Sequence, residues 1–140
     1  MLLRVVLCSL LLAWSPLLAA EESCRVKAAV APQYPPIAVL ARLSGSVAVR
    51  VVVDQSGNVT HADATGGHPV LKKTATEAAK KWKFEVAPAQ SRTTLLEFDF
   101  EILPEKADLE SETTFMPPNR VQVKKRPPES TVSYGKMGRR

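Results

Sequence analysis

The chain has 140 residues, enough for about one domain, and carries a net charge of +5. This basic balance points only weakly to nucleic acid, because few aromatic residues accompany the basic ones, so no nucleic-acid partner is expected. The sequence shows no nucleophile beside a base, no glycine-rich phosphate loop and no paired catalytic carboxylates. We therefore expect neither an enzyme nor a bound cofactor.

Residues 1–20 have the composition of a secretory signal peptide. Arg4 precedes an apolar run that ends in Ala19 and Ala20, small residues of the kind found at cleavage sites. An uncleaved membrane anchor is the alternative, but Pro16 interrupts the run before it reaches the roughly 20 apolar residues of a spanning helix. The sequence thus predicts export and cleavage after Ala20.

Cleavage would remove Cys8 and leave Cys24 as the single cysteine of the mature chain. No disulfide could then close within one molecule, so the fold would depend on its hydrophobic core. Residues 21–31 are expected to connect the cleavage site to the folded domain.

The first predicted elements are a short helix and a strand. The segment PPIAVLARL begins with prolines, places Ile37, Leu40 and Ala41 at helical spacing and stops before Gly45. The next segment, SVAVRVVVD, alternates as a half-buried strand does, with four valines on one face: Val47, Val49, Val51 and Val53.

A turn, a strand, a long helix and a last strand follow. Asp54 can bond nearby amides and Gly57 can adopt a positive φ, so the chain is expected to reverse into a strand at about Val59–Ala64. After Pro69, an amphipathic helix of about four turns is predicted, with an apolar stripe of Val70, Leu71, Ala75, Ala78, Ala79 and Trp82. TTLLEFDFEI then alternates, with Leu96, Phe98, Phe100 and Ile102 inward and Glu97, Asp99 and Glu101 outward.

This order predicts an α+β domain over residues 32–103, with two helices packed on one face of a small three-stranded antiparallel sheet (order α-β-β-α-β). Residues 104–140 have more basic than acidic side chains, four prolines after position 116 and no sustained periodicity. Such a composition is typical of disorder, so this basic tail is predicted to be disordered.

Three segments carry a specific pattern: YPPIAVLARLSGSVAVRVVVDQSGNV, GHPVLKKTATEAAKKWKF and TTLLEFDFEI. In order and spacing they resemble the C-terminal domain of the TonB energy-transducer family, over about residues 32–103. The matching structural positions are Tyr34, Pro35, Gly45, Val47, Asp54, Gly57, Ala75, Ala78, Ala79, Trp82, Lys83 and Phe84.

The resemblance implies a periplasmic protein-binding domain related to energy-dependent transmembrane transport. In the family, the last strand is an exposed edge that pairs with a segment near the N-terminus of an outer-membrane transporter. For this chain it implies an edge that recognises such a segment or a second copy, which leaves monomer and dimer both open. The implied edge residues are Arg92, Thr93, Thr94, Leu95, Leu96, Glu97, Phe98, Asp99 and Phe100.

A complete transducer also has an uncleaved N-terminal helix and a long proline-rich spacer. Here about a dozen residues separate the apolar segment from Tyr34, and even fully extended they reach only about 40 Å. We therefore interpret the chain as a short form that lacks the spacer, for which partner binding is expected and energy transduction by this chain alone is not.

Other features allow weaker hypotheses. His61 and His68 lack further ligands at suitable spacing, so a metal site is not expected. The outward acids of the last strand form either a solvated face or a set of charges that discourages uncontrolled pairing along an edge. The alternative function is an interaction or structural protein that docks on an anionic membrane or cell-wall surface through the basic tail around VQVKKRPP.

Overall fold

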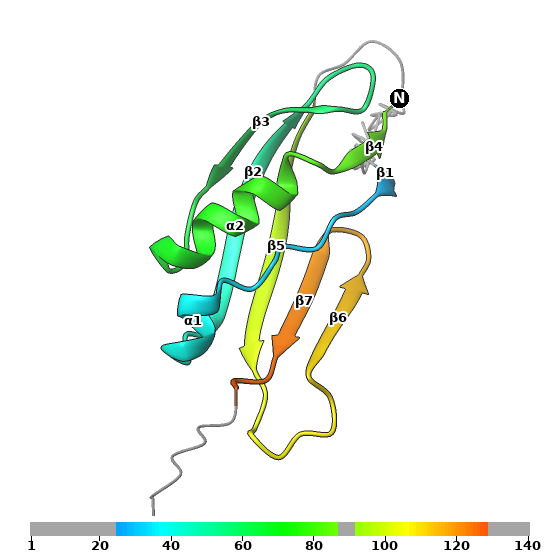
Figure 1. Ribbon diagram of the computed structural model, residues 1–140. Helices are drawn as coiled ribbons and strands as arrows, with labels where there is room; N and C mark the ends of the chain where they lie inside the picture. Colours follow the sequence, from blue (N-terminus) through cyan, green and yellow to red (C-terminus); the bar gives the residue numbers. More distant parts are fainter. Residues whose placement is uncertain (1–24, 87–91, 129–140) are drawn as a thin grey trace, which may run out of the picture.

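The computed structural model describes residues 25–86 and 92–128. The predicted signal peptide and Cys24 lie outside these residues. The elements are β1 Arg25–Ala28, α1 Pro36–Leu40, β2 Gly45–Val53, β3 Val59–Ala64, α2 Pro69–Ala79, β4 Lys83–Glu85, β5 Arg92–Ile102, β6 Ser111–Met116 and β7 Arg120–Lys125 (Figure 1). Among the described residues, no helix has the length and apolar character needed to cross a membrane.

The main sheet has five strands in the order β3-β2-β5-β7-β6, and β1 pairs with β4 in a separate two-stranded ribbon. Strands β3, β2 and β5 pair antiparallel with their neighbours among these three, as the sequence predicts. However, β7 adds parallel to β5 and β6 adds antiparallel to β7, so the sheet is mixed rather than three-stranded and antiparallel.

The prediction that residues 104–140 are disordered is wrong for the two strands β6 and β7. They form a hairpin across residues 117–119 (Figure 1). Two valines of β7, Val121 and Val123, are buried in the same core as the rest of the domain. The composition of residues 104–140 does not predict these strands, because an alternation with only two inward valines is too short to indicate a strand.

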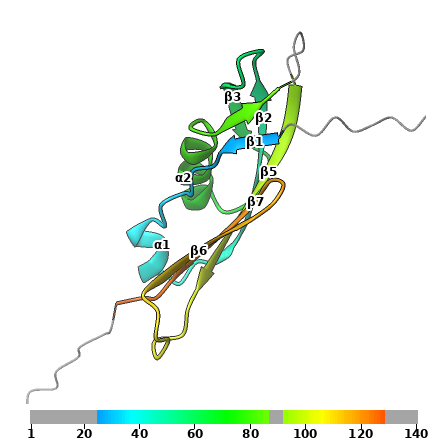
Figure 2. The ribbon, with the colours of Figure 1, turned by 90° about the vertical axis from the view of Figure 1, so that its right-hand side faces the viewer.

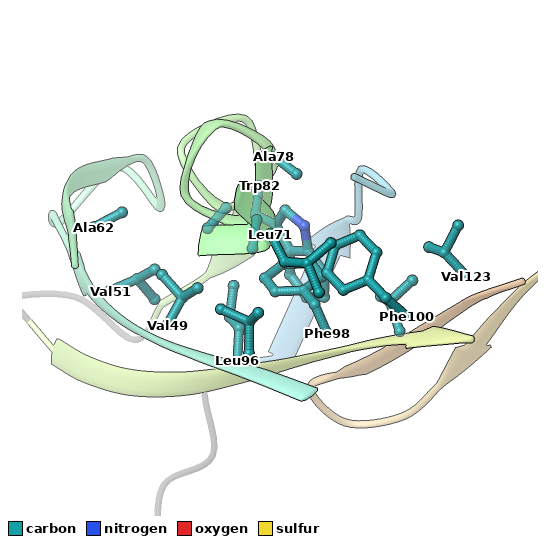
Figure 3. Packing of buried hydrophobic residues seen from close by; sticks show 14 of the residues in the cluster. Val49, Val51, Ala62, Leu71, Ala78, Trp82, Leu96, Phe98, Phe100 and Val123 are labelled. Atoms are coloured by element: carbon teal, nitrogen blue, oxygen red, sulfur yellow. The ribbon is translucent and has the colours of Figure 1, made fainter. Parts of the chain in front are cut away.

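Both helices lie on one face of the sheet, and the core fills the space between (Figure 2). On β5, Ile102 is only partly buried, whereas the other predicted inward residues of β2 and β5 are buried, as are Leu71 and Trp82. Figure 3 shows Phe98 and Phe100 on the same side of the sheet as Trp82, with Val123 continuing that side beyond them. The indole Nε1 of Trp82 donates to the carbonyl of Val30 at 2.8 Å, so its single polar group is satisfied inside the core.

Two helix predictions need correction. Helix α1 buries Ala38 and Val39, whereas Ile37 and Leu40 are 65% and 69% exposed. A helix of five residues can turn only one short face toward the core, and in α1 this face consists of Ala38 and Val39. Helix α2 ends at Ala79, earlier than predicted, and β4 begins at Lys83.

The β2–β3 turn forms as expected. Both Ser56 and Asn58 donate their backbone N–H groups to Asp54 Oδ1 at 2.9 Å. The hydrogen bond from Asn58 is the main reason that the pKa of Asp54 lies below its ordinary value. Gly57 has a φ of 81°, and a Cβ there would lie 1.8 Å from the carbonyl oxygen of Phe84, so only glycine fits.

Candidate partner-binding edge

The nine residues predicted to form a partner-binding edge, from Arg92 to Phe100, lie on β5. In the structure β5 is a central strand, so the prediction that it is exposed as an edge is wrong. One side of β5 pairs with the full length of β2, from Arg92 to Phe100. The other side pairs in parallel with β7 from Glu97 to Ile102.

Backbone hydrogen bonds show how far β7 covers this side of β5. At one end, the N–H of Glu97 donates to the carbonyl of Asn119 at 2.9 Å. The Asn119 side-chain amide also donates to the carbonyl of Leu95 at 2.6 Å. At the other end, the N–H of Leu103 donates to the carbonyl of Lys125 at 2.9 Å. Of the predicted site, residues 92–96 therefore lie outside the parallel pairing with β7.

The side chains of β5 alternate as predicted. Leu96, Phe98 and Phe100 are buried, while Glu97 and Asp99 lie on the face opposite the helices. Phe98 packs edge-on against Trp82, with 5.9 Å between ring centroids.

The outward acids of β5 contact β7, a role that the sequence analysis did not anticipate. Arg120 donates from Nε to the carboxylate of Asp99, and its Nη1 lies 3.7 Å from Glu97 Oε2. Glu101 accepts a hydrogen bond of 3.1 Å from Gln122 Nε2. These contacts join the face of β5 opposite the helices to the hairpin. The acids therefore do not form a freely solvated row, and they do not protect an exposed edge from pairing.

Asp99 has the most closely held of these carboxylates, with 13% of its side chain exposed. Burial, the largest single influence, acts to raise the pKa of Asp99. Hydrogen bonds from Arg120 and from the Ser46 hydroxyl outweigh it, so the pKa lies below its ordinary value. The carboxylate is therefore ionised at neutral pH, where it pairs with Arg120.

Apolar contacts complete the attachment of the hairpin. Val121 and Val123 are 2% and 6% exposed. Phe115 of β6 lies against Trp82, with 5.9 Å between ring centroids, although 42% of it remains exposed. The hairpin is thus an integral part of the core at its β7 strand and only partly so at β6.

The residues identified as structural positions take structural roles. Tyr34 packs edge-on against Phe100 at a centroid distance of 5.2 Å and donates its hydroxyl to the carbonyl of Leu43. Burial raises the pKa of this hydroxyl. Pro35 is the N-cap of α1, and Phe84 is buried beside Trp82. Gly45, at the start of β2, has a φ of 151°.

The histidines are placed as surface and helix-entry residues. His61 is exposed on β3, and His68 caps α2 by accepting from the N–H of Val70 at 3.3 Å. Within residues 25–86 and 92–128, no three histidine, cysteine or acidic side chains gather as metal ligands would.

Comparison with known proteins identifies the family of the chain. Residues 30–102, a little over half of the chain, match the family model described as Gram-negative bacterial TonB protein C-terminal. Two curated relatives, each called Protein TonB and each from Xanthomonas campestris pv. campestris (strains B100 and ATCC 33913), are 40% identical over 58 residues. That aligned stretch is 40% of this chain and 26% of each relative, so the chain spans about a quarter of their length.

Among solved structures, the solution NMR structure of the Pseudomonas aeruginosa TonB CTD aligns with a TM-score of 0.48 and 18% sequence identity. The alignment covers 58% of this chain and 88% of that one. The strands β6 and β7 lie outside the residues that the family model matches. On the family match, the chain is a member of the Gram-negative bacterial TonB protein C-terminal family.

Proposed function

We propose that the chain is a periplasmic, non-enzymatic protein-binding module of TonB-related transport. Its partner in this proposal is an extended segment of an outer-membrane transporter, which joins the sheet as an additional strand. The observation that carries the proposal is the family match over residues 30–102, which spans α1 to β5. Strand addition suits such a module because backbone groups supply the affinity and no reactive side chain is needed.

The pairing of β7 with β5 adds a condition to this function. A partner strand that pairs with Glu97–Phe100 must use the same backbone side that β7 occupies. Since the N–H of Glu97 already donates to Asn119, partner and hairpin compete for one donor. In this proposal the hairpin has to leave β5 before the partner strand can extend along it.

A short stretch of β5 remains as the first contact. Thr93 lies past the end of β7 and is exposed. Along a strand, the N–H and C=O groups of alternate residues point to the same side, so Thr93 presents its groups on the side that Glu97 uses. We infer that a partner segment pairs first at Thr93 and then displaces β7.

Cross-linking in whole cells tests the function. A photo-reactive amino acid at Thr93 should capture an outer-membrane protein through its N-terminal segment. The matched control carries the same group at Thr60, an exposed position on the edge strand β3, which β2 separates from β5. Capture of the same protein from both positions, or from neither, would contradict strand addition at β5.

Docking through the basic tail receives less support from the structure. Lys124 Nζ lies 3.2 Å from Glu112 Oε2, and Arg126 Nη2 lies 3.7 Å from Glu110 Oε1. With Arg120 held by Asp99, these three cations of the described tail each face a carboxylate of this chain. Their attraction for an anionic surface is correspondingly reduced.

A further inference from the structure

The outer strand of the sheet, β6, lacks the features with which edge strands avoid pairing. It is in continuous register with β7 from Ser111 to Met116, without a bulge. No proline interrupts it, and its single charged residue, Glu112, is paired with Lys124 within the hairpin. Exposed edges usually carry charges, prolines or bulges because an unprotected one pairs with other strands.

The opposite edge, β3, is better protected. The register shift between Val52↔His61 and Val53↔Val59 leaves Thr60 as an extra residue, so β3 itself carries a bulge. Asp63 and His61 are exposed along it, and α2 packs against it. Of the two edges of the five-stranded sheet, β6 is therefore the one open to another strand.

The hydrogen bonds of the hairpin show which backbone groups of β6 are available. The N–H of Arg126 donates to the carbonyl of Glu110 at 2.8 Å, which makes these two residues a hydrogen-bonded pair. In an antiparallel ladder such pairs alternate with non-bonded ones. The backbone groups of Glu112 and Thr114 thus point toward β7. Those of Ser111, Thr113 and Phe115 point away from the sheet, as a free edge.

We propose that this edge pairs with the β6 strand of a second copy, antiparallel and about a two-fold axis at Thr113. In that register Thr113 faces Thr113 of the second copy, and Ser111 faces Phe115. All three outward residues of each strand then find partners for both their N–H and C=O groups. The sheets of the two copies become continuous.

Charge and packing both favour a second copy as the occupant. Glu112 falls opposite Thr114 of the second copy, not opposite another acid, and its charge is already balanced by Lys124. Phe115 is 42% exposed at this edge, so each copy brings an aromatic ring next to the new strand. The strand that best matches β6 in length, free backbone groups and low charge is β6 itself.

This inference does not rest on the proposed function, because β6 lies outside the residues that the family model matches. Sedimentation equilibrium of the exported chain should show a monomer–dimer equilibrium. Thr113 is exposed, so a charged side chain there is compatible with the fold. T113K and T113E should each weaken the dimer roughly tenfold, since like charges then face each other at the axis.

Mixing T113K with T113E tests whether residue 113 of one copy faces residue 113 of the other. In an equal mixture the lysine of T113K would face the glutamate of T113E across the axis, and the dimer should return as a heterodimer. His61→Lys, which adds a charge to the exposed face of β3, is the matched control and should leave the dimer unchanged. The proposal is overturned if the unaltered chain stays monomeric up to about 1 mM, if His61→Lys weakens the dimer as much as T113K, or if the mixture fails to restore it.

Discussion

Weakening the attachment of the hairpin should strengthen the binding of a partner strand to β5. The perturbation is the double variant Val121→Ala/Val123→Ala, which trims the two side chains that anchor β7 in the core. Each truncation removes about two buried carbon groups at ~0.8 kcal/mol apiece, so the double variant should cost the docked hairpin about 3 kcal/mol. The exposed ends of β7 and its backbone are unchanged.

If the hairpin must leave β5 before the partner binds, destabilising the docked hairpin should increase the affinity for the partner. The apparent affinity for a ligand is reduced by the fraction of molecules in which its site is open. Lowering the free energy of opening by about 3 kcal/mol should tighten partner binding on the order of a hundredfold. The gain stops once the open form predominates. Fluorescence anisotropy of a labelled peptide, taken from the N-terminal segment of the captured transporter, measures the change.

A matched control separates release of the hairpin from general loosening of the core. Val49→Ala/Val51→Ala removes the same carbon groups from two equally buried valines of β2. These residues pair with Leu96 and Thr94, outside the stretch of β5 that β7 covers. The control should lower the denaturant midpoint by a comparable amount and leave the peptide affinity within a few-fold.

A proline at Glu97 shows whether partner and hairpin use the same donor. The Glu97 N–H points to β7 and not to β2, so Glu97→Pro spares the β2–β5 ladder. Added to the valine double variant, it should abolish the gain in peptide binding because the partner loses that donor too. Unchanged peptide affinity in the valine variant, or full binding despite the proline, would refute competition at β5.

Three further predictions concern stability and export. Trp82→Ala should lower the free energy of unfolding by about 3–5 kcal/mol, since the ring is fully buried and contacts three aromatic residues; a chemical-denaturation midpoint that does not move would contradict this. Because the pKa of Asp99 is lower in the folded state, its pairing with Arg120 contributes stability above about pH 4 that is lost as the pH falls through the folded-state pKa. Asp99→Asn should remove this component from denaturation midpoints measured as a function of pH, and an unaltered acid profile would argue against it. N-terminal sequencing of the exported protein should give a start at Glu21, whereas intact Met1 in the membrane fraction would reject cleavage.

The central part of the fold could be predicted because its signals are local and repeated. Four valines of β2 alternate without interruption, and Leu96, Phe98 and Phe100 do the same on β5. The Asp54–Gly57 turn between β2 and β3 is specified by residue types that few other conformations favour. These patterns identify which residues face the core without any knowledge of strand order.

Strand order is where prediction from the sequence failed. Alternation shows that β5 has an inward and an outward face, but it does not reveal what pairs with each of its backbone sides. The answer depends on β7, whose pairing with β5 joins residues far apart in sequence. In the sequence, nothing connects the acids of β5 to the cations of the tail, although the ion pair of Asp99 with Arg120 accompanies the pairing of the two strands.

The parallel pairing of β7 with β5 also explains why the chain has an unprotected edge. Parallel strands cannot be joined by a tight turn; they require a crossover of about a dozen residues or more, which is most often a helix. Here residues 103–119 make the crossover, and β6 is the strand within it (Figure 1). Because β6 must run antiparallel to β7 and outside it, covering the side of β5 creates a new edge at Ser111–Met116. A partner that displaces β7 from β5 therefore also removes β6 from the end of the sheet. Strand addition at β5 should thus interrupt the continuous sheet of a dimer paired through β6, because the hairpin would then no longer connect that pairing to the rest of the domain.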